Sequence, residues 1–262
     1  MHKKPSASQA PPVVMTIAGS DSGGGAGIQA DLKTFTALGV FGTSAITCLT
    51  AQNPAGVRGI QAAPPRMVAL QMETVASYFR LAAAKTGMLY SAAIIEAVAR
   101  SLRKLRIPWI VVDPVMIATS GARLLRRNAE QALRERLLPL ARVITPNVPE
   151  AEVLLGRRID DAAEAEAAAG QLARRFRTAC VLKGGHLAGS IVTDLLYAGE
   201  HLYRFRAARL KGATHGTGCM FSAALCALLA RGKALPEAVR GAQSYVHSVL
   251  ENSQAFETAR GR

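Results

Sequence analysis

Long apolar runs are missing from this chain of 262 residues. No uninterrupted apolar stretch approaches the roughly 18 residues that a membrane-spanning helix needs. The basic start at residues 1–4 leads into Pro5 and the prolines at 11–12, and not into the apolar segment of a secretion signal. We therefore expect a cytoplasmic protein without a membrane partner, in which residues 1–12 form a disordered leader.

Cysteine is scarce as well. The chain has Cys48, Cys180, Cys219 and Cys226, and no two of them stand at C-x-x-C spacing or near histidines with the spacing of a zinc site. The pattern argues against a disulfide framework and against a structural metal. We expect all four thiols to be reduced.

Aromatic residues make up only 5% of the chain, although its formal net charge is +14. Arginines interleave with leucine and alanine in segments 100–106, 123–136 and 174–177, as they do on solvated helix faces. Because few rings are present to stack on bases, we predict no nucleic-acid partner. A basic surface of this kind attracts phosphorylated small molecules, and a non-enzymatic protein that binds nucleic acid is the distant alternative.

Two common nucleotide motifs are absent or incomplete. The phosphate-loop pattern G-x-x-x-x-G-K-[ST] does not occur. Residues 25–30 match the dinucleotide pattern G-x-G-x-x-[GA], but residues 43–52 contain no acid to hold a ribose. The missing acid argues against a dehydrogenase with a nicotinamide cofactor, so any nucleotide must be bound by another scheme.

Strand and helix patterns alternate along the chain, without an internal repeat or a linker. The first unit is an apolar strand at 13–18, a glycine-rich loop at 19–27 and a helix at 28–38. A hairpin is predicted at 191–207 around Gly199. The alternation predicts a single α/β domain over residues 13–262, a three-layer α/β/α sandwich around a mainly parallel sheet. Further strands are expected at 43–50, 83–88, 108–113, 142–145 and 179–183, and further helices at 67–79, 92–105, 161–177 and 236–251.

The most informative stretch is the run Lys-Gly-Ala-Thr-His-Gly-Thr-Gly-Cys at 211–219, which leads directly into an apolar helix. Gly216 and Gly218 permit backbone angles that gather consecutive amides at the start of that helix. The unpaired amides and the helix dipole there favour a phosphate. The polar residues Thr214 and Thr217 before the helix also indicate an anion site.

Cys219 stands at the start of the same helix. The dipole and any bound cation are expected to lower the pKa of a thiol in this position, so Cys219 is a candidate base or nucleophile. The alternative is a small apolar residue that packs beneath the helix.

Several polar residues follow predicted strands, where parallel sheets bind their ligands. Gln52 is placed to pair with a heterocycle or to cap a turn. Asp113 is placed to work on a metal or a phosphate, or else to cap the loop that follows it. Lys183 is placed to contact phosphate oxygens, or else it is a solvated surface residue. Asn147 and Glu150 are also explained as helix caps, and Met88 as a core residue.

These motifs together resemble the hydroxymethylpyrimidine/phosphomethylpyrimidine kinases, a thiamin-biosynthesis branch of the ribokinase-like superfamily. The similar blocks are quoted as they stand here: Gly-Ala-Gly-Ile-Gln-Ala-Asp-Leu-Lys-Thr-Phe, Ala-Gln-Asn, Val-Asp-Pro-Val-Met, Thr-Pro-Asn-Val-Pro-Glu, Leu-Lys-Gly-Gly-His and Thr-His-Gly-Thr-Gly-Cys. They occur in the family's order from about residue 16 to 229. The resemblance implies a ribokinase-like fold, usually dimeric.

The resemblance also implies roles for individual residues. Gly19, Asp31, Gln52 and Met88 would contact the pyrimidine. Cys219 would take or orient the hydroxymethyl proton, beside an anion hole made by the amides of 216–218. The residues implied on the nucleotide and magnesium side are Asp113, Asn147, Glu150, Lys183 and Thr214.

The implied activity is ATP- and Mg²⁺-dependent phosphorylation of 4-amino-5-hydroxymethyl-2-methylpyrimidine, and then of its monophosphate to the diphosphate. A pyridoxal or pyridoxine kinase of the same fold is the nearest alternative. Two departures stand out: Thr86 replaces the family's isoleucine, and the chain ends at Arg262 without the usual Gly-x-Gly-x-Gly-Pro-Val segment.

Overall fold

The nine strands of the described chain form one sheet in the order β3-β2-β1-β4-β5-β6-β7-β8-β9. The computed structural model describes residues 10–117, 121, 123–186, 189–210 and 216–257. Strands β2, β1, β4, β5, β6 and β7 are parallel, whereas β3, β8 and β9 are joined to their neighbours by antiparallel pairing. The strands are β1 (Val13–Asp21), β2 (Phe41–Asn53), β3 (Gly56–Ala62), β4 (Leu81–Thr86), β5 (Trp109–Val112), β6 (Val143–Ile144), β7 (Ala179–Leu182), β8 (Ile191–Ala198) and β9 (His201–Ala208).

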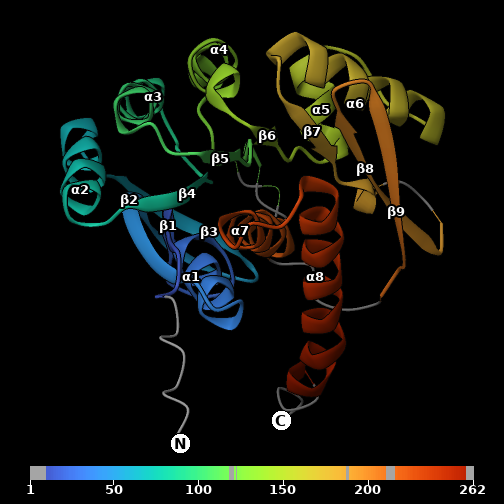
Figure 1. The fold of residues 1–262 in the computed structure, drawn as a ribbon, viewed down its shortest axis with the longest axis horizontal. Helices are drawn as coiled ribbons and strands as arrows, with labels where there is room; N and C mark the ends of the chain where they lie inside the picture. The colour runs from blue at the N-terminus through green and yellow to red at the C-terminus, as the bar shows by residue number, and fades with distance from the viewer. Residues whose placement is uncertain (1–9, 118–120, 122, 187–188, 211–215, 258–262) are drawn as a thin grey trace, which may run out of the picture.

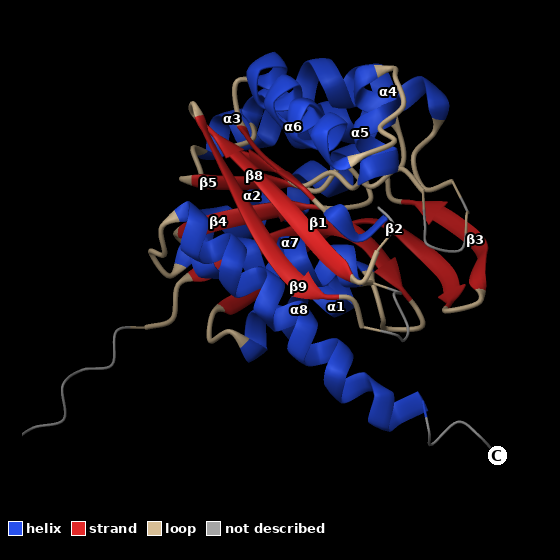
Figure 2. Ribbon diagram, turned by 90° about the vertical axis from the view of Figure 1, so that its right-hand side faces the viewer, coloured by secondary structure: helices blue, strands red, loops and turns tan. Residues whose placement is uncertain are grey.

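Helices cover both faces of the sheet, which gives the three layers expected from the alternating pattern (Figures 1 and 2). On one face lie α2, α3, α4, α5 and α6, and on the other lie α1, α7 and α8. The longer helices are α1 (Gly27–Ala37), α2 (Pro65–Tyr78), α3 (Ala92–Leu105), α5 (Val148–Leu155), α6 (Ala162–Phe176), α7 (Thr217–Ala230) and α8 (Leu235–Glu257). Short helical turns are η1 (Arg127–Ala129), α4 (Glu130–Ala132), η2 (Leu133–Leu137), η3 (Leu138–Leu140) and η4 (Gly184–His186).

Two apolar cores fill the spaces between the layers. The larger core lies under α2, α3, α5 and α6 and includes Met72, Ile94 and Leu102. The second lies under α1, α7 and α8 and includes Phe35 and Phe221. Helix α7 is apolar on all sides because it packs against β4, β5, α1 and α8 at once.

Local signals explain where most helices begin and end. Ser91 and Asp161 cap α3 and α6 through their side chains, and Asn147 caps α5. Helices α3 and α6 end at Arg106 and Arg177 in left-handed backbone conformations, with φ of 48° and 53°. Most of the predicted elements are found close to their expected boundaries.

The sequence patterns missed strand β3, which folds back on β2 as a hairpin. Its residues are mostly half-buried or exposed, and two glycines interrupt the alternation of side chains. The arginine-rich segment before residue 138, whose pattern is typical of a solvated helix face, is helical. Its elements η1, α4, η2 and η3 follow one another without a gap from Arg127 to Leu140. In the part of the chain that the structure describes, no helix has the length and apolarity needed to cross a bilayer.

Candidate active site

A pocket opens where the parallel strands β1 and β2 end and where α1 and α7 begin. The glycine loop after β1, the end of β2, the turn after β4, the loop after β5 and the start of α7 all contribute to it. Its lining residues are Ala18, Gly19, Ser20, Asp21, Ala26, Gly27, Thr50, Gln52, Met88, Val115, Leu124 and Cys219. The pocket thus lies at the carboxyl edge of the sheet, where α/β proteins bind ligands.

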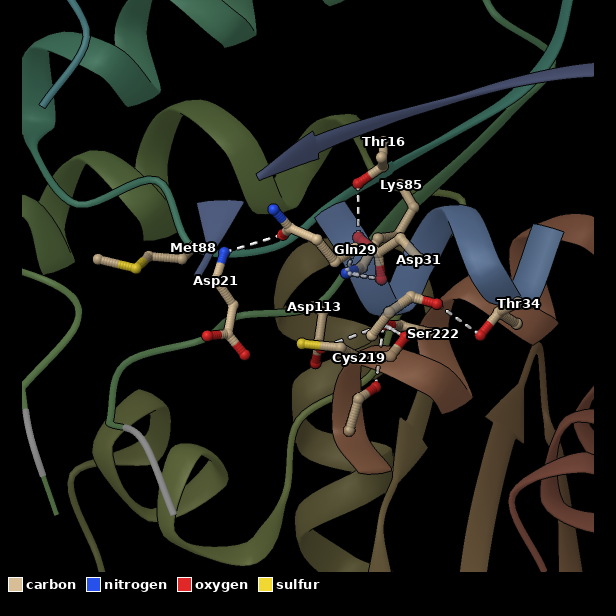
Figure 3. Close-up of polar contacts among 12 residues, drawn as sticks. Thr16, Asp21, Gln29, Asp31, Thr34, Lys85, Met88, Asp113, Cys219 and Ser222 are labelled. Atoms are coloured by element: carbon tan, nitrogen blue, oxygen red, sulfur yellow. Dashed lines mark hydrogen bonds and ion pairs between the residues drawn. The ribbon is translucent and has the colours of Figure 1, made fainter. Parts of the chain in front are cut away.

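The glycine loop after β1 is ordered by the carboxylate of Asp21. Its oxygens accept hydrogen bonds from the amides of Gly23 (2.8 Å), Gly25 (3.1 Å) and Ala26 (2.8 Å). The Asp21 amide in turn donates to the side chain of Gln29 at 2.9 Å (Figure 3). Because the Asp21 carboxylate already accepts from these amides, they are not available to a bound anion, and the first loop shapes the pocket.

Gln52 is fixed in the pocket wall through its main chain and its side chain. Its amide donates to the Ser22 hydroxyl at 2.9 Å, and that hydroxyl donates to the Gln52 carbonyl at 2.8 Å. Thr50 donates to Oε1 of Gln52 at 3.1 Å. The primary amide is therefore held at the end of β2, where the sequence predicts it.

Two sulfur atoms form another wall of the pocket. Met88 Sδ lies 3.7 Å from Cys48 Sγ, and Thr47 donates to the Met88 carbonyl at 2.6 Å. A Cβ atom on Gly19 would lie 2.8 Å from Cys48 Sγ and 3.3 Å from Met88 Sδ. Gly19 is therefore required by the close packing of these sulfurs, a role that its place in a glycine-rich loop did not reveal.

The second glycine loop touches the first. Gly216 has a φ of 81°, and a Cβ atom there would lie 1.9 Å from the carbonyl oxygen of Gly25. Thr217 is the first residue of α7, so the amides of 217–219 stand at the positive end of its dipole. Thr214 and the rest of 211–215 lie outside the described residues.

The environment of Cys219 corrects an expectation from the sequence. Burial raises the pKa of its thiol to about 11, and the nearby Lys85 ammonium and the hydrogen bond from the Gly27 amide offset only part of this effect. The helix dipole was expected to lower the pKa, but loss of water around the sulfur outweighs it. Cys219 is therefore a neutral thiol near pH 7, and it lines the pocket.

A second polar cluster surrounds Asp113, directly after β5. Its Oδ1 accepts from Thr145 at 3.0 Å and from the Lys183 ammonium at 2.9 Å, and its Oδ2 accepts from Ser222 at 3.1 Å. Ser222 lies one turn into α7, beyond Cys219 (Figure 3). Burial opposes the charge of Lys183, but the Asp113 and Glu150 carboxylates outweigh burial and raise its pKa.

Asn147 and Glu150 form the reciprocal cap of α5. The Asn147 amide donates to Glu150 at 2.9 Å, and the Glu150 amide donates to Asn147 Oδ1 at 2.8 Å. Burial and the neighbouring Asp113 raise the pKa of Glu150 to about 7, although Lys183 acts in the opposite direction. The capping alternative is thus realised, and the cap sits beside the Asp113 cluster.

Asp31 does not line the pocket, and its predicted contact with a pyrimidine needs correction. The side chain is fully buried. It accepts from the Lys85 ammonium at 2.9 Å and from the Thr16 hydroxyl at 2.6 Å (Figure 3). These contacts occupy both carboxylate oxygens of Asp31, which lies in α1, so Asp31 stabilises the structure next to the pocket without lining it. Lys85 was not identified from the sequence, because an ion pair between distant strands and helices leaves no local pattern.

The acids of the site are suited to magnesium in number and type. Among the described residues, no cluster of three or more His, Cys, Asp or Glu side chains is arranged as a complete metal cage. Magnesium commonly binds through one or two carboxylates and takes its other ligands from water and substrate phosphates. Asp113 and Glu150, which interact electrostatically, fit that donor set.

Comparison with known proteins agrees with this geometry. Residues 21–262 match the family described as phosphomethylpyrimidine kinase. The hydroxymethylpyrimidine/phosphomethylpyrimidine kinase of Rhizobium meliloti is 48% identical over 252 residues, which cover 95% of this chain and 94% of that protein. The thiamine biosynthesis bifunctional protein ThiED of Geobacter sulfurreducens is 47% identical over 249 residues, 95% of this chain. This chain spans only 51% of the length of that bifunctional protein.

Solved structures show the same fold. The phosphomethylpyrimidine kinase of Clostridium difficile has a TM-score of 0.82 and 37% identity, over 91% of this chain and 99% of that one. The pyridoxal kinase of Staphylococcus aureus has a TM-score of 0.86 and 34% identity, over 93% of this chain and 89% of that one. That pyridoxal kinase has been solved with pyridoxal and with ADP.

Proposed function

The chain belongs to the phosphomethylpyrimidine kinase family, and on that premise we propose how its pocket performs the reaction. It is a phosphotransferase of the ribokinase-like fold that acts in thiamine biosynthesis and uses ATP. Its proposed substrates are 4-amino-5-hydroxymethyl-2-methylpyrimidine and the monophosphate of that compound. The observation that supports this best is that the start of α7 and the amide of Gln52 meet at one pocket.

The pyrimidine is proposed to lie between Gln52 and the sulfur wall. The primary amide of Gln52 pairs with a ring nitrogen and an exocyclic amine through one donor and one acceptor. Met88 supplies a polarizable apolar surface for the ring. Gly19 completes the wall, because any larger residue would collide with the two sulfurs. In this orientation the hydroxymethyl group points toward Cys219.

Phosphoryl transfer then takes place at the start of α7. The reaction passes through a loose transition state, so positioning and neutralisation of charge matter more than proton abstraction. The amides of Gly216, Thr217, Gly218 and Cys219 stabilise the charge on the moving group. Lys183 lies close by, since a Cβ on Gly218 would be 3.3 Å from its ammonium. The neutral Cys219 thiol orients the hydroxymethyl oxygen and is not a thiolate formed in advance.

Magnesium is proposed to bind near Asp113 and Glu150. When bound, Mg²⁺ would neutralise charge on the phosphates of the nucleotide. Asp113 is held by Thr145 and Ser222, and Lys183 pairs with its Oδ1. These contacts fix the carboxylate, so the protein supplies an oriented oxygen and an adjacent cation. Asn147, by capping α5, fixes the backbone of Glu150. Thr214 is proposed to contact the nucleotide phosphates.

The protein is further proposed to act as a cytoplasmic homodimer made of single domains over residues 13–262, without nucleic-acid or membrane partners. Five exposed large apolar side chains lie on β2 and α2, which contact each other, and exposed apolar side chains of this kind support association of two copies. They are Phe41, Leu49, Met67, Leu70 and Tyr78.

The test is a phosphorylation assay with ATP and Mg²⁺ on hydroxymethylpyrimidine, its monophosphate and pyridoxal, alone and in competition. Replacement of Gln52 by alanine should lower kcat/KM for the pyrimidines by about 10- to 100-fold, as expected for a lost pair of hydrogen bonds. Gln61→Ala is the matched control, because Gln61 is an exposed glutamine on the neighbouring strand β3. Equal loss in both variants would contradict the placement of the ring.

Pyridoxal kinase is the second candidate activity, because a pyridoxal kinase shares both the fold and 34% of aligned residues with this chain. A higher kcat/KM for pyridoxal than for hydroxymethylpyrimidine in the competition assay would replace the proposed substrate. Steep salt-dependent binding to random duplex DNA without kinase activity would replace the enzyme assignment altogether.

A further inference from the structure

A second hollow, which is lined by arginines, lies at the opposite edge of the sheet from the active site. It is formed where β6 and β7 begin, at the end of α6 and at the turn between β8 and β9. The lining residues are Ala141, Arg142, Ala173, Arg174, Arg177, Thr178, Ala179, Tyr197 and Gly199. The hollow measures about 440 Å³. The hollow lies at the amino ends of the parallel strands β6 and β7, whereas the active site lies at the carboxyl ends of the parallel strands, so the two sites are on opposite edges of the sheet.

The charge of the hollow is of one sign. Three of its lining residues are arginines, and none is an aspartate or glutamate. Within the described chain, the guanidinium groups of Arg142 and Arg177 form no ion pair or hydrogen bond with another residue. Three like charges around one hollow repel each other, and an anion would relieve that repulsion.

One of the three arginines is held in place in advance. Arg174 lies over the ring of Tyr197, with its Cζ 5.5 Å from the ring centre, and donates to the Tyr197 hydroxyl at 3.0 Å. The pair packs against α6 at Gly170, where a Cβ atom would lie 3.1 Å from the Tyr197 ring and 3.2 Å from Arg174. A guanidinium fixed in this way loses little freedom when it binds an anion.

Helix stabilisation alone does not explain the arrangement. Cations in the last turn of a helix interact favourably with its dipole. Arg175, in the last turn of α6, also donates to the Leu154 carbonyl near the end of α5 at 2.9 Å, so its position has a structural explanation. Arg142 is not in a helix; it directly precedes β6. It nevertheless converges on the same hollow as Arg174 and Arg177.

We propose that this hollow, lined by Arg142, Arg174 and Arg177, is a second anion site that binds a small molecule with a di- or triphosphate group. One guanidinium group can donate two parallel hydrogen bonds to the oxygens of one phosphate. Three arginines therefore match a chain of two or three phosphates better than a single phosphate. The volume of this open hollow lies in the range of small-molecule sites. The site is independent of the proposed kinase reaction.

The test is titration calorimetry of the full chain with inorganic tripolyphosphate at constant ionic strength. The double variant Arg142→Ala/Arg177→Gly removes two charges, and glycine suits the left-handed backbone at 177, where φ is 53°. We expect this variant to weaken binding at the hollow at least tenfold. Its melting temperature in circular dichroism should not fall below that of the parent protein. Arg66→Ala, at an exposed arginine on α2, should bind like the parent.

The active site also attracts phosphates, so a second variant separates the two sites. In Lys183→Gln, the binding step assigned to the hollow should remain, while binding at the Asp113 cluster weakens. A single binding step that is lost in Lys183→Gln and unchanged in the arginine double variant would overturn the proposal. Loss of duplex DNA binding in the double variant, without any tripolyphosphate binding by the parent, would also overturn it in favour of a nucleic-acid surface.

Discussion

At the scale of single residues, Gly216 shows how closely the anion loop is fitted to its surroundings. Alanine at 216 would combine a left-handed backbone with a Cβ atom 1.9 Å from the Gly25 carbonyl oxygen. We expect Gly216→Ala to lower kcat/KM at least about 100-fold, as for the loss of a donor to a developing charge. Gly232→Ala is the matched control, because Gly232 has the same φ of 81° with nothing within 4 Å.

The control should lose only the cost of the backbone angle, about 1–2 kcal/mol of unfolding free energy, and keep its activity. Steady-state kinetics and urea unfolding measure the two quantities. If Gly216→Ala behaved like Gly232→Ala in both, the contact between the two loops would have no part in the reaction.

Lys85 and Asp31 form a fully buried ion pair, so removal of one partner leaves the other charged and unpaired. Lys85→Met should lower the free energy of unfolding by about 3–5 kcal/mol. The double variant Lys85→Met/Asp31→Leu should be more stable than Lys85→Met, since neither charge is then left buried. The exposed pair of Lys104 and Glu73, 4.0 Å apart, provides the control, and Lys104→Met should change stability by less than about 1 kcal/mol.

The pKa of Cys219, raised to about 11, predicts how its reactivity depends on pH. Because the thiolate is the form that reacts, the rate of alkylation by iodoacetamide should rise about tenfold per pH unit from pH 7 to 10 without a plateau. Mass spectrometry after timed quenching gives the rate at Cys219, and Cys219→Ser provides the baseline. A rate that levels off above about pH 9.5 would show that the thiol ionises as it does in water.

At the scale of secondary-structure elements, α5 combines a structural role with a proposed catalytic one. Asn147 caps this helix and stands beside the Asp113 cluster, whereas Asp161 caps α6 away from the pocket. Each change to alanine should cost about 1 kcal/mol of stability. Only Asn147→Ala should also reduce kcat. Equal activity in the two variants, measured at equal folded fraction, would leave Asn147 with capping alone.

Most elements were predictable because their signals are local. The Asn-x-x-Glu cap of α5, the glycine before α7 and the apolar strand ends that place Gln52 and Asp113 can all be read from neighbouring residues. The hairpin strand β3 and the pairing of Lys85 with Asp31 depend on contacts between distant segments. The raised pKa of Cys219 was missed for the same reason, because burial of the sulfur is set by α1 and α7 together. Thr214 stays a prediction.

At the scale of the whole molecule, the apolar side chains on β2 and α2 bear on the proposed dimer. Leu49 and Leu70 are 56% and 51% exposed, and burial of such residues favours association. Leu49→Asp/Leu70→Asp should shift the protein from dimer to monomer in size-exclusion chromatography with light scattering. Ile191→Asp, on β8 toward the other edge of the sheet and 55% exposed, should leave the mass unchanged. A monomeric parent protein would refute the dimer.

The contact between Gly216 and the Gly25 carbonyl also bears on protein engineering. These residues are far apart in the sequence, yet a Cβ atom at position 216 would collide with the Gly25 carbonyl oxygen. Attempts to graft the anion loop onto a related scaffold, or to broaden the substrates accepted, should therefore exchange both segments as one module. A chimera with mismatched partners is expected to fold with a displaced α7 and to show poor turnover with every alcohol tried.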